Sequence, residues 1–301
     1  MTDLLWGIDL GGTKIECAVL DKKNHDVILR ERTSTESEQG VAHILSRIHS
    51  LVEDARQTTG STPVTIGIGT PGSLDSETGL LKNSNTTCLN GVPLKKELES
   101  ILGLSVIMAN DANCFALAES LLGVVPEKCP EAEVVFGVIM GTGVGGGVVV
   151  NGKVLNGLHG IGGEWGHIRL ESPGAPCYCG SSGCVETVLS GPALERHYAN
   201  LSGKTLPLKE IAELTETDKH AAATINRLVE MFSKGICQVI NVLDPDAIII
   251  GGGVGNIEQL YQACPAEIDK HIFNHHFHGR LLKPKLGDSA GVFGAAMLTL
   301  N

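Results

Sequence analysis

The sequence is short of basic residues. It contains 23 lysines and arginines against 34 aspartates and glutamates, which gives a formal net charge of −11 at pH 7. An acidic chain without a basic patch has nothing with which to replace the counterions of a nucleic acid or of an anionic membrane surface. We therefore expect a small-molecule substrate and neither of those partners.

Long hydrophobic runs are also missing. No stretch approaches the ~20 apolar residues that a membrane-spanning helix needs. The opening residues, MTDLLWGIDL, have neither the basic segment nor the apolar segment of a leader peptide. We expect no membrane partner and a cytoplasmic location.

The familiar nucleotide-binding motifs are absent or out of context. GxxxxGK[ST], the P-loop pattern, does not occur. GIGTPG (67–72) and GTGVGG (141–146) satisfy G-x-G-x-x-G, but a polar loop follows the first and a strand pattern follows the second. The dinucleotide fingerprint has to open a helix after a strand. These two absences exclude a P-loop protein and disfavour a Rossmann site.

Strand and helix patterns alternate along the chain. Short apolar runs predict strands, and the apolar spacing over 41–60 predicts an amphipathic helix. The expected strands are 4–10, 14–20, 26–32, 64–70, 104–111 and 246–253, and further helices are expected at 94–103, 112–123, 206–216, 220–245 and 291–300. Such alternation is typical of an α/β protein, and 301 residues exceed the usual size of one domain.

The chain contains an internal repeat. EVVFGVIMGTGVGGGVVVNGKVL (133–155) has the same strand, glycine turn and strand pattern as LLWGIDLGGTKIECAVL (4–20) when Ile139 is aligned with Asp9. Two similar domains are therefore expected, with a boundary near 120–132.

The first glycine turn, DLGGTK, has the residues of a phosphate site. Gly11 and Gly12 can bring backbone N–H groups to phosphate oxygens, Thr13 and Lys14 add a hydroxyl and a charge, and Asp9 could hold Mg²⁺ through water. The alternative is an ordinary glycine-rich hairpin with a solvated lysine. A second hairpin of the same type favours a nucleotide held by both; its residues are Gly141, Thr142, Gly143, Val144, Gly145 and Gly146.

Taken together, the motifs resemble those of one family. DLGGTK, GIGTPG, NDAN (110–113), GTGVGGG, EWGH with CYCGSSGCVE, and IIIGGG occur in this order over essentially the whole chain. This set resembles the ROK family of bacterial sugar kinases. The resemblance implies an α/β fold of the actin/hexokinase-like ATPase (ribonuclease H-like) type, with two similar domains around a central cleft.

The resemblance also implies where the nucleotide binds and how the chain divides. Both hairpins would bind ATP phosphates, and Gly251, Gly252 and Gly253 would lie near the nucleoside. The C-terminal helix would pack on the first domain. The expected division is 1–121 plus 290–301 for the smaller domain and 122–289 for the larger one.

Asp111 is the candidate catalytic base. It follows a buried strand, and phosphoryl transfer to an alcohol needs a carboxylate that orients the hydroxyl and accepts its proton. Asp and Asn at such a position more commonly cap the following helix. In the ROK family the matching Asp is the base and the preceding Asn, here Asn110, contacts the sugar. Capping is then expected of Asn113.

A cluster of metal-ligand residues follows in the second half. His167, Cys177, Cys179 and Cys184 form H-x9-C-x-C-x4-C, one imidazole and three thiols. This is the ligand set of a closed structural Zn²⁺ site, which would hold a loop in shape. The alternative is a loop of free thiols. The other cysteines, of nine in all, are dispersed, so a disulfide framework is not expected.

The metal loop would present acids to a sugar. Folding the loop brings Glu164 and Glu186 to one place, and carboxylates suit pairs of sugar hydroxyls. The family resemblance implies sugar contacts for Glu164, His167 and Glu186, with one His167 nitrogen on zinc and the other on a hydroxyl. Solvated surface carboxylates are the alternative.

Further contacts follow from position in the family. Gly72 and Asn85 should line the sugar pocket, although a plain turn residue is an alternative for Asn85. The histidines of FNHHFHG (273–279) are not expected to bind metal, because no cysteine or acid accompanies them.

The resulting hypothesis is ATP-dependent phosphorylation of a hexose at its primary hydroxyl. D-fructose giving D-fructose 6-phosphate is the favoured reaction, because 80–94 and 284–298 resemble the fructokinase (mannokinase) branch. N-acetylglucosamine, glucose and mannose are alternatives. The expected cofactors are ATP, Mg²⁺ and structural Zn²⁺, and a homodimer is implied by the resemblance.

Two alternatives belong to other classes of protein. A ROK-type repressor is disfavoured because the first strand starts by Leu4 and leaves no room for a helix-turn-helix. A sugar sensor without catalysis is disfavoured by the intact NDAN and DLGGTK motifs.

Overall fold

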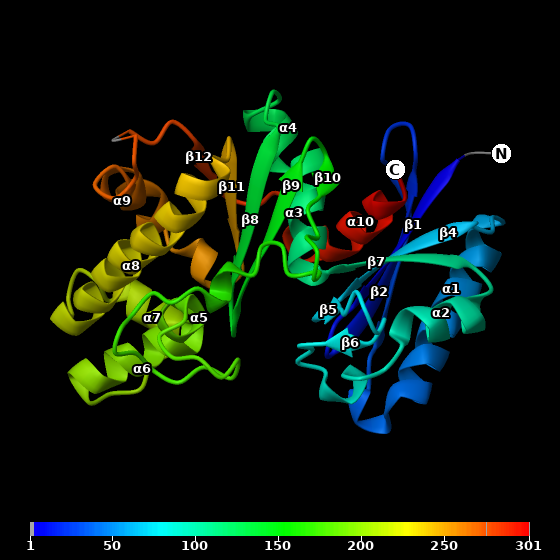
Figure 1. Ribbon diagram of the computed structural model, residues 1–301, viewed down its shortest axis with the longest axis horizontal. Helices are drawn as coiled ribbons and strands as arrows, with labels where there is room; N and C mark the ends of the chain where they lie inside the picture. The colour runs from blue at the N-terminus through cyan, green and yellow to red at the C-terminus, as the bar shows by residue number, and fades with distance from the viewer. Residues whose placement is uncertain (1–2, 275, 301) are drawn as a thin grey trace. The chain divides into compact units, whose positions relative to one another are not determined.

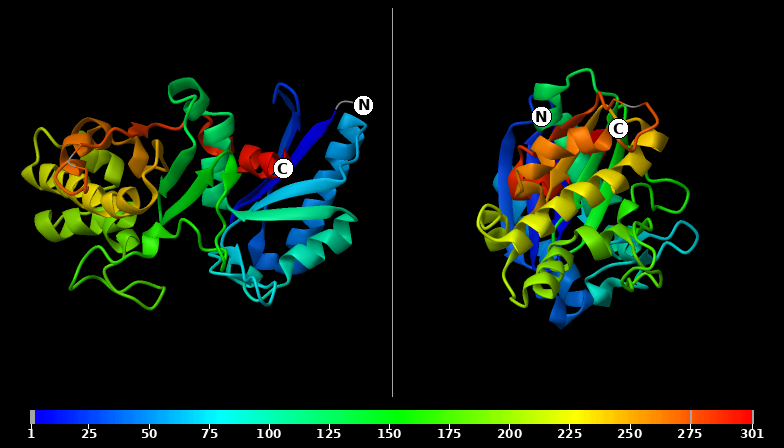
Figure 2. Two further views of the ribbon diagram at one scale, coloured as in Figure 1. Left: turned by 45° about the horizontal axis from the view of Figure 1, so that its top comes forward. Right: turned by 90° about the vertical axis from the view of Figure 1, so that its left-hand side faces the viewer.

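The computed structural model describes residues 3–274 and 276–300. The chain forms two compact units. One consists of the chain up to Pro126, Gly152–Gly162 and the chain from Lys285; the other consists of Glu127–Asn151 and Gly163–Pro284. Figures 1 and 2 show that each unit is built around a twisted sheet with helices packed on it.

The first unit is organised by a five-stranded sheet in the order β3-β2-β1-β4-β7. β1 (Leu4–Leu10), β2 (Lys14–Asp21) and β3 (Val27–Ser34) pair antiparallel. β4 (Thr65–Thr70) and β7 (Ser105–Asn110) continue parallel to β1. The carboxyl ends of β1, β4 and β7 therefore meet at one edge.

Helices cover this sheet. α1 (Val41–Thr59) buries the apolar positions that its sequence spacing predicts and ends at Gly60, which adopts φ 62°. α10 (Ala290–Met297) packs on β1 and β4 and against α3 (Asp111–Leu121), as Figure 1 shows. A Cβ atom at Gly7 or Gly67 would collide with the α10 backbone, so these glycines permit the close packing.

Glu119 of α3 anchors the turn into α10. Its carboxylate is fully buried and accepts hydrogen bonds from the backbone N–H groups of Val124, Lys285 and Leu286 at 2.7–3.1 Å. The smaller elements associated with this unit are β5 (Ser73–Leu74), β6 (Leu81–Lys82), α2 (Leu94–Leu102), α4 (Val124–Lys128) and β10 (Lys153–Val154).

The sheet of the second unit repeats this plan. β9 (Val144–Val150), β8 (Val134–Met140), β11 (Ala247–Gly251) and β12 (Arg280–Leu282) are adjacent in this order. β8 and β9 are antiparallel, whereas β8, β11 and β12 are parallel, which matches β1, β2, β4 and β7. The repeat inferred from the sequence is therefore present in strand order and direction.

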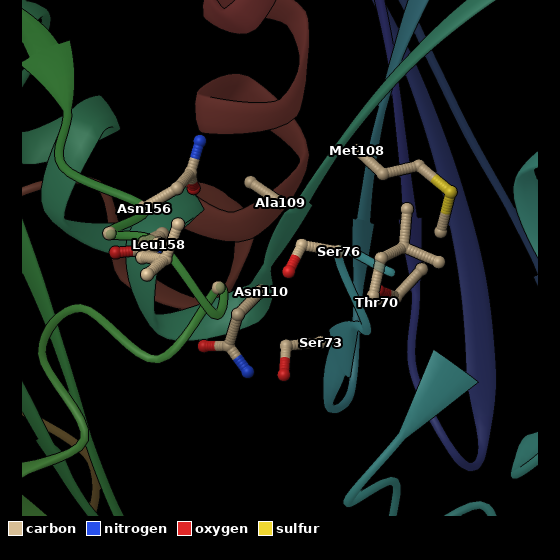
Figure 3. Close-up of a pocket in the computed structure, with 12 residues that line it drawn as sticks. Thr70, Ser73, Ser76, Met108, Ala109, Asn110, Asn156 and Leu158 are labelled. Carbon is tan, nitrogen blue, oxygen red and sulfur yellow. The ribbon is translucent and has the colours of Figure 1, made fainter. Parts of the chain in front are cut away.

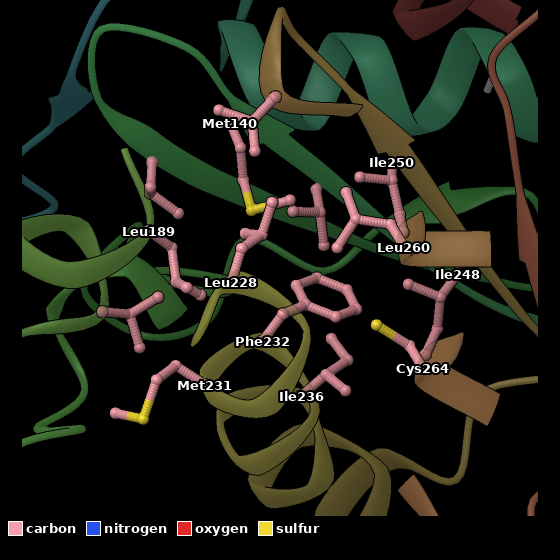
Figure 4. Packing of buried hydrophobic residues seen from close by; sticks show 14 of the residues in the cluster. Met140, Leu189, Leu228, Met231, Phe232, Ile236, Ile248, Ile250, Leu260 and Cys264 are labelled. Atoms are coloured by element: carbon pink, nitrogen blue, oxygen red, sulfur yellow. The ribbon is translucent and has the colours of Figure 1, made fainter. Parts of the chain in front are cut away.

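The core of the second unit is built on one long helix. α8 (Lys219–Leu243) places Leu228, Phe232 and Ile236 against Ile248 and Ile250 of β11, as seen in Figure 4. The helix ends before Pro245, with Asp244 in a left-handed conformation. The other helices are α5 (Val185–Leu189), α6 (Gly191–Ser202), α7 (Leu208–Glu213) and α9 (Gln259–Ile268). None of the helices in the described ranges is both long and apolar enough to cross a membrane.

Candidate functional site

The first hairpin turn is closed by its own backbone and fixed by charge. Gly11 N–H donates to the Lys14 carbonyl at 2.9 Å. The Lys14 ammonium lies 3.5 Å from Glu16 and 3.7 Å from Asp288. Glu16 is fully buried and also binds the guanidinium groups of Arg30 and Arg32. The Lys14 side chain is therefore held in place by a charge network.

Asp9 is a buried carboxyl group whose pKa responds to the charges of Glu16 and Lys14. Its pKa is raised to about 7, mainly by burial; the charges of Asp111 and Glu16 contribute to the rise and the charge of Lys14 opposes it. A divalent cation bound nearby stabilises the ionised form of a carboxyl group that lacks sufficient counter-charge. Asp9 therefore fits the Mg²⁺ role predicted for it.

Asn110 and Asp111 join β7 to α3. The Asn110 side chain caps the helix by accepting the Ala112 N–H at 2.8 Å, and its amide donates to the Gly72 carbonyl at 3.3 Å. Asp111 Oδ1 also accepts the Ala112 N–H at 2.8 Å. Capping by Asn113 was a wrong expectation, because Asn113 lies inside the helix and is buried.

A pocket of about 210 Å³ opens beside Asn110 in the first unit. It lies at the carboxyl ends of β4 and β7, where α/β folds commonly bind ligands. Its walls are Thr70, Ser73, Leu74, Ser76, Met108, Ala109, Asn110, Asn113, Asn156, Gly157, Leu158 and Gly160, several of which Figure 3 shows. Gly72 touches this site only through its hydrogen bond from Asn110, and Asn85 is exposed outside the lining.

The second hairpin turn carries no ionisable side chain and is held by backbone contacts. Gly141 N–H donates to the Gly143 carbonyl at 2.9 Å, and Gly191 N–H donates to the Gly141 carbonyl at 2.8 Å. Glu186 Oε2 accepts the Val144 N–H at 3.0 Å. A Cβ at Gly143 would lie 2.7 Å from the same carboxylate oxygen. The turn and Glu186 are thus in direct contact.

A larger cavity of about 1020 Å³ adjoins this turn. Gly141, Thr142 and Gly253 line it. The neighbouring Gly252 has φ +79°, and a Cβ atom there would lie 2.3 Å from the Met140 carbonyl oxygen, so only glycine fits. Most of the remaining walls come from α6, α7 and the start of α9; they include Pro192, Glu195, Leu208, Lys209, Ala212, Asn256 and Ile257. Its size suits a nucleoside.

Gly145, Gly146 and Gly251 do not line this cavity. Gly145 and Gly146 belong to β9. Gly146 packs beneath Trp165, whose indole N–H donates to the Gly145 carbonyl at 3.0 Å. Gly251 ends β11, buried and paired in register with Ile139.

The structure brings the four predicted metal ligands together. One ligand atom from each of His167, Cys177, Cys179 and Cys184 lies within 4.8 Å of the others. This is the only group of three or more such side chains found within 3–274 and 276–300. The histidines of 273–279 form no such group, although His275 lies outside the described residues.

The spacing within this cluster fits zinc. In a tetrahedron with ordinary Zn–S and Zn–N lengths, two sulfurs are about 3.8 Å apart and a sulfur and a nitrogen about 3.6 Å apart. Cys179 Sγ lies 3.7 Å from Cys184 Sγ, and Cys177 Sγ lies 3.6 Å from His167 Nδ1. Burial raises the pKa of Cys184 to about 12, so a thiolate there requires a neighbouring cation.

The second nitrogen of His167 already has a neighbour. Its Nε2 lies 3.0 Å from the Tyr178 hydroxyl, and the two rings meet edge to face. Tyr178 is itself 73% exposed on the metal loop. Burial raises the pKa of Glu164, and the nearby Glu186 charge adds to the rise. The charges of His167 and Glu186 both act on Glu164, so these three side chains lie near one another.

Several of these residues carry no sequence signal. Tyr178 sits between two cysteines in an otherwise ordinary turn, Ser73 begins the two-residue strand β5, and Asn156 belongs to a loop without a motif. Glu195 and Lys209 at the larger cavity look like surface charges on amphipathic helices. Only spatial proximity identifies them.

The ROK family model matches residues 5–301, and the chain belongs to the ROK family. It is 37% identical to an N-acetyl-D-glucosamine kinase of Mannheimia succiniciproducens, with 99% of this chain and 100% of that one covered.

Solved structures agree in fold. A ROK hexokinase from Thermus thermophilus superposes with a TM-score of 0.88 at 32% identity, covering 98% of this chain and 97% of that one. A ROK family glucokinase from Streptomyces griseus, in complex with glucose and AMPPNP, gives 0.76 at 28% identity, covering 98% and 99%. The fold is thus the actin/hexokinase-like α/β fold expected from the motifs.

Proposed function

We propose that this protein is an ATP-dependent sugar kinase that phosphorylates the primary hydroxyl of a hexose. One observation carries the proposal. The glycine hairpin, Asp9 and Asp111 all lie at the carboxyl ends of parallel strands of the first sheet, and the charge of Asp111 is close enough to raise the pKa of Asp9. Phosphate-binding amides, a cation ligand and a base are the groups that phosphoryl transfer needs.

The reaction assigns a role to each group. Asp111 accepts the proton of the attacking hydroxyl as the oxygen–phosphorus bond forms and the bond from the γ-phosphorus to the bridging oxygen of ADP breaks. The amides of the two glycine turns and the Lys14 ammonium stabilise the transferring phosphoryl charge. Mg²⁺, when bound, neutralises phosphate charge, and Asp9 would hold it. The 1020 Å³ cavity takes the nucleoside of ATP, with Gly253 in its wall. A place near the nucleoside for Gly251 and Gly252 stays a prediction.

We assign hydrogen bonds with the sugar to Asn110, Glu164, His167 and Glu186, in which the two carboxylates accept from sugar hydroxyls. Glu186 Oε2 is engaged by the Val144 N–H, so we assign its Oε1 to a sugar hydroxyl. His167 Nε2 exchanges the Tyr178 hydroxyl for a sugar hydroxyl. Gly72 acts through Asn110, and the role of Asn85 stays a prediction.

N-acetylglucosamine is the proposed acceptor. The M. succiniciproducens relative carries that name, as does one from Histophilus somni that is also 37% identical. The prediction of fructose finds no support among these relatives. From the family resemblance we also propose a cytoplasmic homodimer, and from the ligand spacing a structural Zn²⁺ in the metal loop.

The replacement Asp111→Asn tests the proposal. Because the amide cannot accept the proton, we expect kcat to fall by about 10²–10⁴-fold while sugar binding, followed by calorimetry without ATP, is retained. Asp54→Asn, an exposed change on α1, is the matched control. Near wild-type turnover of Asp111→Asn with ATP and N-acetylglucosamine would disprove the assignment of the base.

A further inference from the structure

Tyr178 lies in the metal loop between two of the expected ligands, Cys177 and Cys179. Its backbone is part of a tight turn, in which the Gly180 N–H donates to the Cys177 carbonyl at 3.1 Å and the Cys177 N–H donates to the Ser181 carbonyl at 2.8 Å. Tyr178 as a whole is nevertheless 73% exposed. The turn therefore fixes the backbone, whereas the side chain can rotate into solvent without disturbing a core.

The hydroxyl of Tyr178 contacts a residue to which we assign the sugar. It lies 3.0 Å from His167 Nε2, and the two rings meet at 90° with their centroids 5.1 Å apart. The pKa of Tyr178 is raised to about 12, first by partial burial of the hydroxyl and then by the charges of Glu186 and Glu164. The hydroxyl is therefore close to the imidazole and to both of the acids proposed to bind the sugar.

The His167 ring has only one hydrogen to offer at this point. Its Nδ1 lies 3.6 Å from Cys177 Sγ and belongs to the ligand cluster. When Nδ1 is a metal ligand, the neutral ring carries its single hydrogen on Nε2. That N–H donates to the Tyr178 oxygen, and it cannot donate to a sugar hydroxyl at full strength at the same time. The tyrosine and the sugar therefore exclude each other at Nε2.

Tyr178 can replace a sugar hydroxyl because the two groups have the same hydrogen-bonding chemistry. A hydroxyl has one hydrogen to donate and two lone pairs that accept. The Tyr178 oxygen can accept from His167 while its O–H is available to a nearby carboxylate. A hydroxyl attached to the chain beside its partner also competes at a high effective concentration, which a dissolved sugar has to overcome.

We propose that Tyr178 is a built-in competitor for the sugar hydroxyl that binds His167, and that its side chain rotates away as the sugar enters. Tyr178 thereby determines how tightly the site binds a hexose. The inference rests on the proposed sugar kinase function and adds to it a residue that sets the affinity for the substrate.

The direction of the effect of Tyr178→Phe separates this role from two others. Phenylalanine keeps the ring that meets His167 and loses only the competing hydroxyl, so sugar binding should become tighter. A tyrosine that itself held the sugar would give weaker binding when its hydroxyl is removed. A tyrosine that only braced the metal loop would give a loss of zinc or a lower melting temperature without tighter binding.

The experiment is a calorimetric titration of the zinc-loaded protein with N-acetylglucosamine in the absence of ATP. The sugar has one hydrogen bond fewer to displace in Tyr178→Phe, which predicts a Kd lower by about fivefold. With saturating ATP, KM should fall by a similar factor while kcat stays unchanged, because the tyrosine has left the site before phosphoryl transfer. Zinc per chain should equal that of the wild type.

Tyr198→Phe is the matched control, because it removes a tyrosine hydroxyl elsewhere in the same unit. The Tyr198 hydroxyl donates to Asp218 at 2.8 Å, and the ring packs with Ile211 and Ala221 in a separate cluster. This variant should have a lower melting temperature and an unchanged Kd for the sugar. The control thus separates the effect at His167 from the general effect of the substitution.

A Kd that is unchanged or higher in Tyr178→Phe, or loss of its zinc, would overturn the inference, and continued turnover with ATP would leave the kinase proposal standing. Tighter binding of N-acetylglucosamine without phosphoryl transfer by either protein would support the inference and overturn the kinase proposal. Failure of both proteins to bind N-acetylglucosamine, glucose and fructose would overturn the assigned sugar site together with the inference.

Discussion

The two glycine hairpins share one backbone plan and differ in what holds them. In the first, the paired strands end at Leu10 and Ile15, and the ammonium of Lys14 is fixed by the buried carboxylate of Glu16. In the second, the paired strands end at Met140 and Val144, and the turn between them has no ionisable side chain. One hairpin is positioned by charge and the other by close packing.

The difference shows how a duplicated element acquires separate tasks. The first hairpin keeps ionisable groups beside it, at the cost of an Asp9 carboxyl whose pKa is far from its ordinary value. The turn of the second hairpin has no ionisable side chain of its own. Instead Glu186, two residues after the metal ligand Cys184, accepts a hydrogen bond from the Val144 N–H. Charge should therefore govern the behaviour of the first unit, and steric fit and metal that of the second.

The largest effect should come from the metal loop. Cys184 is fully buried in the ligand cluster, so Cys184→Ser should abolish zinc binding and destabilise the second unit by on the order of 5 kcal/mol or more. Zinc per chain is measured by emission spectroscopy, and hydrogen exchange should rise in β8–β9 and stay unchanged in β1–β2. Cys129→Ser, in the same unit, is the control. Retention of one zinc per chain would contradict the expected ligand set.

The next largest effect should be a pH dependence of the free energy of unfolding that comes from Asp9, beside the first hairpin. Because the folded pKa of Asp9 is about 7 against 3.8 normally, the native state binds more protons than the unfolded state between these values. The free energy of unfolding therefore falls as pH rises through that window and stays lower above it.

Asp9→Asn should remove this fall. At pH 8, without added Mg²⁺, the variant should be more stable than the wild type by up to about 4 kcal/mol, and the gain should shrink toward pH 5. Urea unfolding at several pH values measures it, with Asp54→Asn as the control. A gain independent of pH would mean that Asp9 is ordinarily acidic in the folded protein.

The third effect is steric. A methyl group at Gly166, which packs against β9 of the second hairpin, should lower the free energy of unfolding more than the loss of the Glu16 charge does beside the first hairpin. A Cβ at Gly166 would collide with the Val144 carbonyl, whereas a Cβ at Gly141 meets nothing within 4 Å. We expect Gly166→Ala to cost about 3 kcal/mol and Gly141→Ala less than about 1 kcal/mol in unfolding free energy. Equal costs from denaturant titration would argue against steric control.

The smallest effect concerns the charge network of the first hairpin. Glu16→Gln leaves Arg30 and Arg32 without their buried partner, but both arginines are more than one-third exposed. We expect a loss of about 2 kcal/mol, smaller than for a fully buried pair. Glu97→Gln, exposed on α2, serves as the control. A stability equal to that of the control variant would show that water replaces the carboxylate.

Much of this architecture was accessible from the sequence, because periodicity and ligand spacing are local. The apolar spacing of 41–60 and the glycine turns predicted α1 and both hairpins, and H-x9-C-x-C-x4-C predicted the cluster that the fold assembles. These signals need only neighbours along the chain.

The unpredicted features depend on contacts between distant residues. Glu16 and Ser289 are hydrogen-bonded across most of the sequence, and Glu186 and Val144 across a long interval. The loop Gly152–Gly162 belongs with the first unit and completes its pocket, which no pattern in the loop indicates.

The packing of α10 has a consequence for biosynthesis. On the ribosome, β8, β9, β11 and β12 all emerge before Lys285, so the second sheet can assemble while translation continues. The first sheet emerges earlier, yet Gly7 and Gly67 stay uncovered until the final helix arrives and Glu119 fastens its leading turn. The half of the molecule that is synthesised first is therefore the half that is finished last, and its nascent apolar face is the one that chaperones would have to shield.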